Sequence, residues 1–172
     1  PDHWVHDPET GGGRILGEGC HFIDLAAYLA DAPITVVYAE PMRSLPQLND
    51  TVVINLGFTN GSIASICYFS NGNKNTPKEE LEVFAGGIVA HLDDFQRLMV
   101  ISDSGKKLFK ANGDKGHTAE VLAFLQSIRD GSPAPISFGN IYNSMKATFK
   151  VIESIKTSTR ITLETNNFLN LD

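Results

Sequence analysis

Long apolar runs, cysteine and positive charge are all scarce in this sequence of 172 residues. No run approaches the ~18–20 apolar residues of a membrane span, and no signal peptide is visible, so we expect no membrane contact. A net charge of −6 argues against nucleic-acid binding, which needs a basic surface. Two cysteines, Cys20 and Cys67, are too few for a disulfide framework and predict free thiols in a cytoplasmic protein.

Motifs for nucleotide binding and nucleophilic catalysis are also missing. The dinucleotide-binding fingerprint Gly-x-Gly-x-x-Gly ends in a glycine. Stretch 11–16 has Leu16 at that position, and stretch 17–22 has Phe22 there. Neither stretch follows a buried strand, and no phosphate-binding loop or Gly-x-Ser-x-Gly elbow occurs. The polar segment 2–9 lacks the spacing of the helical zinc motif, so we expect a loop there and no metal site.

The most informative stretch that is present runs over 10–29, where three glycines precede an apolar-periodic run. Gly11, Gly12 and Gly13 provide backbone freedom and permit another surface to approach closely. His21 and Asp24 share one face of the predicted helix, so a flexible loop delivers an imidazole with a carboxylate one turn later. A buried stripe is predicted on the neighbouring face, with Tyr28 at the edge of the core: Phe22, Leu25, Ala26 and Leu29.

Downstream, β-branched and alternating segments predict strands that are joined by tight turns. Asn60-Gly61 is the strongest short-range hairpin signal, and Asp103-Ser104-Gly105 predicts another hairpin. Segment 70–77 is too polar to pack and predicts a loop. The predicted strands are 34–38, 51–58, 62–69, 80–85, 88–92, 98–101, 106–109 and 160–163.

Two further helices are predicted, one over 119–129 and one that follows an N-cap at Asn140. Their apolar faces are expected at Val121, Leu122, Leu125 and Ile128, and at Ile141, Met145, Phe149, Ile152 and Ile155. Because the strands are segregated from the helices, we predict an α+β fold with helices on one face of a mainly antiparallel (mixed) sheet. One domain over 1–165 and a tail over 166–172 are expected.

Apolar residues lie on both faces of the predicted central hairpin, for example Val52 and Val53. Helices can cover one face of such a sheet, and a partner subunit is the expected cover for the other. We therefore predict a homodimer or tetramer that forms through the sheet.

The triple glycine, Gly19, His21 and Asp24 give this stretch a resemblance to a known family. It resembles the C-terminal domain of the glucose–fructose oxidoreductase / inositol dehydrogenase (Gfo/Idh/MocA) family. The amino-acid sequence of 17–24 is similar to that of a subgroup associated with polysaccharide or sugar-nucleotide metabolism. The order of the predicted elements agrees with that domain over nearly the whole chain.

The resemblance implies an NAD(P)-dependent oxidoreductase that acts on a hydroxyl of a sugar or sugar nucleotide. It implies that His21 accepts the proton, that Asp24 is a candidate to orient it, and that Trp4, Gly12, Gly13 and Arg14 border the substrate. The sequence begins with Pro1, and we expect the domain that binds NAD or NADP upstream of it. The isolated chain is therefore expected to be inactive.

The sequence departs from the family pattern at one position. Many members carry Asp four residues before this histidine, whereas Gly17 stands there in this chain. Glu18 is adjacent and is a candidate replacement, although one residue corresponds to about 100° around a helix. Two alternatives stay open, namely a non-catalytic homologue that serves in assembly or ligand sensing, and an unrelated antiparallel-sheet binding module.

Overall fold

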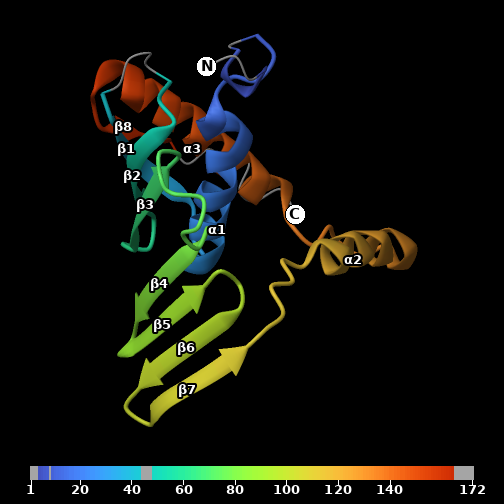
Figure 1. Cartoon of the computed structure of the whole chain (residues 1–172). Coiled ribbons are helices and arrows are strands. Elements are labelled where there is room, and N and C mark those ends of the chain that lie inside the picture. The colour runs from blue at the N-terminus through green and yellow to red at the C-terminus, as the bar shows by residue number, and fades with distance from the viewer. Residues whose placement is uncertain (1–3, 8, 44–47, 165–172) are drawn as a thin grey trace. The chain divides into compact units, whose positions relative to one another are not determined.

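The computed structural model describes residues 4–7, 9–43 and 48–164, and the predicted tail lies outside them. Seven strands follow one another between α1 and the last two helices, so strands and helices are segregated along the chain, and the α+β prediction is confirmed (Figure 1). The chain divides into two compact units, 1–71 with 136–172 and 72–135, which are described separately. The prediction of a single domain over 1–165 stays a prediction.

The first unit is built on a four-stranded antiparallel sheet of order β3-β2-β1-β8. Its strands are β1 (Ile34–Pro41), β2 (Thr51–Phe58), β3 (Ile63–Phe69) and β8 (Ile161–Thr162). The hairpin predicted at Asn60-Gly61 is confirmed, because the Phe58 amide donates to the Ser62 carbonyl at 3.1 Å across that turn. Because side chains alternate between the two faces of a sheet, every second residue of these strands faces the core.

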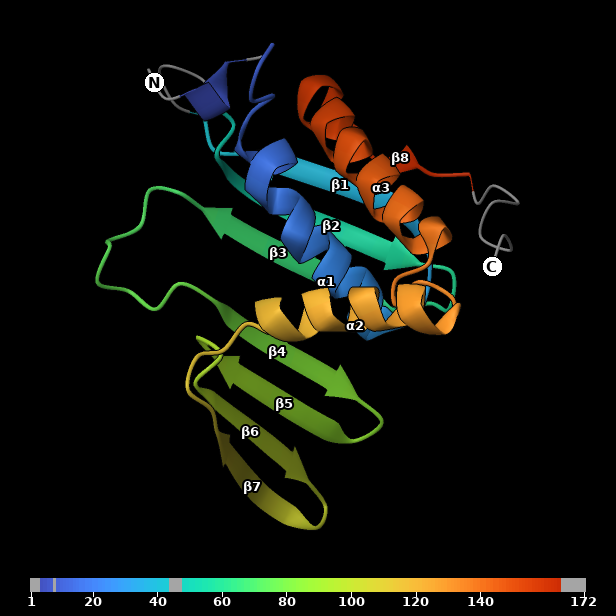
Figure 2. The same ribbon diagram turned by 90° about the vertical axis from the view of Figure 1, so that its right-hand side faces the viewer.

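Two helices cover one face of this sheet. The helices α1 (Cys20–Ala30) and α3 (Phe138–Thr157) lie side by side across the strands in Figure 2. Ile23 of α1 and Val151 of α3 are fully buried against Ile54 of β2. The opposite face of the sheet carries Ile63 and Phe69, which are 87% and 56% exposed.

The start of α3 lies three residues before the predicted position. Ser137, and not Asn140, is the N-cap, since the Ser137 hydroxyl accepts a hydrogen bond from the Asn140 amide at 3.1 Å. A serine side chain at this position satisfies a backbone N–H group that the helix leaves without a partner.

The buried face of α3 is small and polar in its first half, and the prediction for that half is wrong. Ile141, Met145 and Phe149 are exposed, whereas Ile152 and Ile155 do pack against the core. The residues that face the sheet are Asn143, Ser144, Ala147, Thr148, Val151 and Ser154. The Ser154 hydroxyl accepts from the Ala39 amide at 3.0 Å, and Asn143 forms two hydrogen bonds with Ile34. Small side chains allow α3 to approach β1 closely enough for these contacts.

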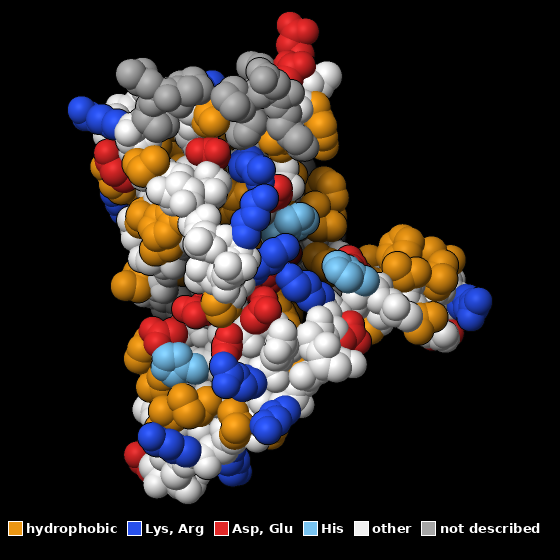
Figure 3. Space-filling view, viewed as in Figure 1, with side chains coloured by type: hydrophobic (Ala, Val, Ile, Leu, Met, Phe, Trp, Pro, Cys, Tyr) orange, Lys and Arg blue, Asp and Glu red, His pale blue; other side chains and the backbone are white. Residues whose placement is uncertain are grey.

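The second unit is an antiparallel meander followed by a helix. Its strands are β4 (Glu80–Ala85), β5 (Ile88–Asp93), β6 (Arg97–Ser102) and β7 (Gly105–Lys110), and the helix is α2 (His117–Asp130). The turn predicted at 103–105 is confirmed between β6 and β7. The predicted apolar face of α2 is exposed in this chain, and orange side chains gather on one part of this helix in Figure 3.

The stripe predicted for α1 is also partly wrong. Ile23 is the fully buried residue of this helix, whereas Leu29 is 42% exposed and Tyr28 is 80% exposed. The predicted end of the helix is confirmed at Asp31, which takes the left-handed conformation with φ 48°. No helix in the described part of the chain is both long and apolar enough to cross a bilayer.

Candidate functional site

The three-glycine loop folds back over a short 3₁₀ turn at Trp4–His6 (η1). A Cβ atom on Gly11 would lie 2.5 Å from the backbone of Val5, so no other residue fits there without a shift. Gly12 and Gly13 have φ values of 67° and 95°, a region that side chains disfavour. The close approach expected from these glycines is confirmed, and the surface that approaches is the chain's own N-terminal turn.

The amides of the two glycines predicted to border the substrate are already used within the loop. The Gly12 amide donates to the Asp7 carbonyl and the Gly13 amide to the Val5 carbonyl, each at 2.8 Å. Trp4, the third such residue, is 65% exposed on the same turn. A contact between these residues and a ligand stays a prediction, and the Gly12 and Gly13 amides serve the fold.

The loop leads into a π-helical turn, Ile15–Gly19 (η2), that continues directly as α1. The Cys20 amide donates to the Ile15 carbonyl five residues earlier, which is the π-helical pattern. Ile15 and Gly19 are buried, so this turn is anchored on its inner side. Single π turns inside helices occur frequently at functional sites.

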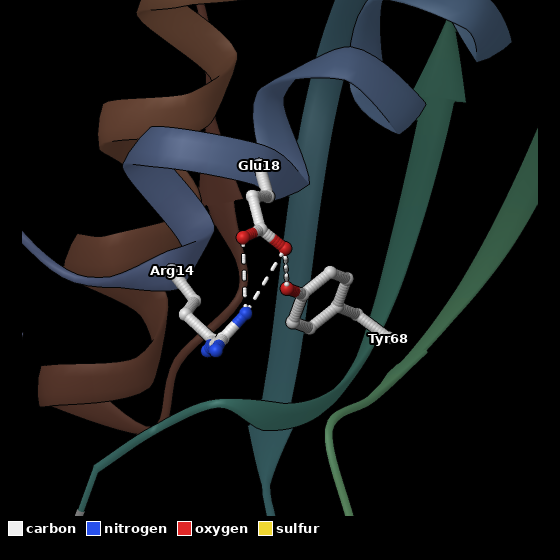
Figure 4. Close-up of polar contacts among 3 residues, drawn as sticks. All are labelled: Arg14, Glu18 and Tyr68. Carbon is white, nitrogen blue, oxygen red and sulfur yellow. Dashed lines mark hydrogen bonds and ion pairs between the residues drawn. The ribbon is translucent and has the colours of Figure 1, made fainter. Parts of the chain in front are cut away.

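On its outer side the π turn holds a polar cluster of Arg14, Glu18 and Tyr68 (Figure 4). Arg14 Nη1 lies 3.0 Å from Glu18 Oε1 and 3.2 Å from Glu18 Oε2. The Tyr68 hydroxyl, from β3, donates to Glu18 Oε2 at 2.5 Å. Glu18 thus accepts three hydrogen bonds from two residues that are 54 positions apart in the sequence.

The electrostatics of this cluster favour a charged guanidinium on Arg14 beside a neutral phenol on Tyr68. Burial, and then the hydrogen bond to Glu18, raises the pKa of the Tyr68 phenol. The hydrogen bond to the Tyr68 hydroxyl raises the pKa of the Arg14 guanidinium, burial acts against it, and the charge of Glu18 adds a smaller increase. The Tyr68 ring also contacts Phe22 of α1, with ring centroids 6.1 Å apart.

His21 and Asp24 lie in the first two turns of α1, but no hydrogen bond joins them in the described residues. The His21 side chain is exposed, and its imidazole makes no hydrogen bond or ion pair with another described residue. Asp24 is turned toward α3, where its Oδ1 accepts a hydrogen bond from the Ser144 hydroxyl at 2.7 Å. The structure therefore assigns Asp24 a contact that connects the two helices, and its predicted orienting role toward His21 stays a prediction.

Sequence reasoning missed Tyr68 and Ser144, the partners of two predicted site residues. Tyr68 is one residue of an alternating strand, and Ser144 is a small polar residue on a helix. Neither pattern distinguishes a residue that faces a site from one that faces the core. Within the described ranges, no group of three or more His, Cys, Asp or Glu side chains is placed to hold a metal ion.

A family model described as the GFO/IDH/MocA C-terminal domain matches residues 1–87, half of the 172 residues. The chain belongs to this family. The match includes the triple glycine, the π turn, His21 and all three residues of the polar cluster. A search of curated proteins finds no match to this sequence.

Several solved structures have the fold of this GFO/IDH/MocA C-terminal domain. A levoglucosan dehydrogenase in complex with NADH and levoglucosan is 19% identical, with a TM-score of 0.81 over 95% of this chain and 54% of that one. A putative oxidoreductase from Thermotoga maritima is 17% identical, with a TM-score of 0.77 over 95% and 50%. A UDP-N-acetylglucosamine 3-dehydrogenase from Acidithiobacillus ferrooxidans is 17% identical, with a TM-score of 0.68 over 80% and 45%. The chain thus spans about half the length of these proteins.

Proposed function

We propose that this chain is the substrate-binding domain, bearing the catalytic histidine, of an NAD(P)-dependent oxidoreductase. Its substrate would be a hydroxyl of a sugar or sugar nucleotide. Membership of the GFO/IDH/MocA family supports this, together with a fold similar to enzymes that are named as dehydrogenases of levoglucosan and UDP-N-acetylglucosamine. The subgroup linked to polysaccharide or sugar-nucleotide metabolism is part of the proposal.

In this proposal His21 accepts the proton of the hydroxyl that is oxidised. The observation that carries it is an exposed imidazole, bonded to no described residue, on the helix that the polar cluster and the glycine loop anchor. Imidazole exchanges protons readily near neutral pH, which suits a general base. A bound nicotinamide would supply the chemistry of hydride acceptance, and none of the described residues is assigned to hold it.

The test is the substitution His21→Ala in the full-length protein. Loss of a general base typically lowers turnover by about 10²- to 10⁴-fold, so we expect that loss with an unchanged melting temperature. NAD+ reduction is measured with levoglucosan, D-glucose, myo-inositol and UDP-N-acetylglucosamine. His117→Ala, which removes an exposed histidine from the start of α2, is the matched control.

Normal turnover by the His21→Ala variant would refute the proposed base. Turnover that falls only in proportion to the folded fraction would assign His21 a structural role and favour the non-catalytic alternative. If the unaltered protein oxidises none of the four compounds, the proposed substrate class is contradicted.

We also propose that the chain assembles as a homodimer or tetramer through the face of β3-β2-β1-β8 that lies away from α1 and α3. Ile63 and Phe69 are exposed there, beside Val36 and Val53 on the same face. A partner copy would bury this apolar surface. A cytoplasmic location is proposed as well, and it is supported by Cys20 and Cys67, which are both free thiols.

A further inference from the structure

The hydrogen-bond capacity of the Glu18 carboxylate is not exhausted by its two partners. A carboxylate has about four acceptor sites, two on each oxygen. Oε2 accepts from the Tyr68 hydroxyl and from Arg14, whereas Oε1 accepts from Arg14 alone within the described residues. One acceptor site is therefore open on Oε1, and the Glu18 side chain is 50% exposed.

The donors around Glu18 also determine what its carboxylate can do. Arg14 and Tyr68 both donate to it, so the carboxylate acts as an acceptor toward both partners. Tyr68 belongs to the rigid strand β3, and its ring packs beside Phe22, so the direction of this carboxylate is fixed from the sheet. Fixed donors orient a carboxylate, and this suits a group that positions a ligand.

Glu18 is also close to the proposed base. Three residues of chain span at most about 10–11 Å between Cα atoms. Glu18 and His21 are three residues apart across the junction of η2 and α1, and both side chains are exposed. A ligand with several hydroxyl groups is the kind of molecule that contacts both.

We propose that Glu18 binds a second hydroxyl of the substrate at Oε1 and takes no part in proton transfer, and that Tyr68 is the positioning residue that aims it. This rests on the proposed function, because the substrate is taken to be a polyhydroxylated sugar. Tyr68 thereby becomes a determinant of substrate affinity, although it lies on a strand and not on the helix that carries the base.

The test is the substitution Tyr68→Phe in the full-length protein, with whichever of the four compounds named above is oxidised fastest. Phenylalanine keeps the ring contact with Phe22 and removes only the hydroxyl. Loss of one hydrogen bond that aims the carboxylate is expected to raise KM about 3- to 10-fold. We expect kcat to stay within about twofold and its pH profile to be unchanged, because proton transfer is assigned to His21.

The chain offers a matched control in the same sheet. The Tyr38 hydroxyl of β1 donates to Glu40 Oε2 at 2.8 Å, and Tyr38, like Tyr68, is half-buried beside an exposed glutamate. Tyr38→Phe should leave both kinetic constants unchanged. Equal effects of the two substitutions would overturn the inference.

Glu18→Gln is the second variant, since it keeps one carbonyl acceptor and removes the charge. We expect a raised KM with the pH profile retained. A fall in kcat of about 10²-fold or more with the loss of one limb of that profile would show proton transfer by Glu18 and overturn the inference.

Failure of the inference can be distinguished from failure of the proposed function. If His21→Ala abolishes turnover and Tyr68→Phe leaves KM unchanged, only the inference fails. If none of the four compounds is oxidised, levoglucosan is titrated against the protein with ¹³C-labelled glutamate side chains. A shift of the Glu18 carboxyl resonance that Tyr68→Phe abolishes would then support the inference, and no shift would overturn it.

Discussion

The pair of hydrogen bonds between Asn143 of α3 and Ile34 of β1 predicts a large stability cost for Asn143→Ala. The Ile34 amide donates to Asn143 Oδ1 at 2.8 Å, and Asn143 Nδ2 donates to the Ile34 carbonyl at 3.1 Å. Asn143 is 6% exposed and Ile34 is fully buried. The substitution removes the side-chain partner of two buried backbone groups.

The magnitude follows from these contacts. Removing the partner of a buried polar group costs about 1–3 kcal/mol, so two such groups predict a loss of about 2–6 kcal/mol in the free energy of unfolding. Small domains are stable by about 5–15 kcal/mol, so the variant would lose a large part of its stability. Asn140→Ala, on the exposed face of α3, should change stability by less than about 0.5 kcal/mol.

The assay is urea-induced unfolding of the chain, followed by the fluorescence of Trp4, the single tryptophan, which belongs to the same unit as α3. A second variant, Asn143→Asp, tests the role of the donor. Its ionised carboxylate has nothing to donate to the Ile34 carbonyl, whereas its protonated form has an O–H group. The loss in free energy of unfolding that Asn143→Asp causes, relative to the unaltered chain, should therefore become smaller as the pH is lowered.

The reasoning fails if Asn143→Ala and Asn140→Ala unfold at the same urea concentration with the same slope. It also fails if the stability loss caused by Asn143→Asp does not depend on pH. Either result would mean that apolar packing alone holds α3 on the sheet.

Two further predictions concern the alkaline range and the sheet. Because the pKa of Tyr68 is raised from its ordinary value of 10.0, its stabilising contribution is complete below pH 10 and is lost as the pH rises through the folded-state value. The stability difference between the unaltered chain and Tyr68→Phe, measured by urea unfolding, should therefore narrow above pH 10, and a constant difference would contradict it. Phe69→Glu should shift sedimentation of the chain from dimer or tetramer to monomer, whereas Phe84→Glu, at an exposed site in the second unit, should not. A monomer before substitution would refute assembly through the sheet.

Local turn chemistry made much of the fold predictable. The Asn60-Gly61 and 103–105 turns each lie between two segments predicted to be strands, and the turn residues and the flanking strands agree on both hairpins. The stop at Asp31 and the C-cap of α2 at Gly131 follow from the same kind of short-range signal. These features depend on neighbouring residues alone.

The buried faces of the helices were less predictable, because periodicity identifies an apolar row without identifying its partner. On α3 the apolar row of Ile141, Met145 and Phe149 is exposed, while Asn143 and Ser154 are buried. Their burial is favourable only because backbone groups of β1 bond to them. That compensation involves residues more than 100 positions apart.

The candidate site shows the same limit. The stretch of glycines followed by His21 was visible in the sequence, and so was the oddity of Glu18 beside Gly17. The distant partner of Glu18 was not visible, because Tyr68 lies 50 positions away in sequence and reaches Glu18 only when β3 packs beneath the helix. Asp24 was paired with His21 by helical spacing, whereas the structure bonds it to Ser144 of another helix.

The π turn between the glycine loop and α1 has a consequence for the comparison of related sequences. Such a turn holds about one residue more than the α turn it replaces. A relative with an ordinary α turn here would keep its glycine loop and its histidine in the same places in space and have one residue fewer between them. Such a relative would align to this chain with a single-residue gap at 15–19, and a search pattern that fixes the eight positions between Gly13 and His21 would miss it.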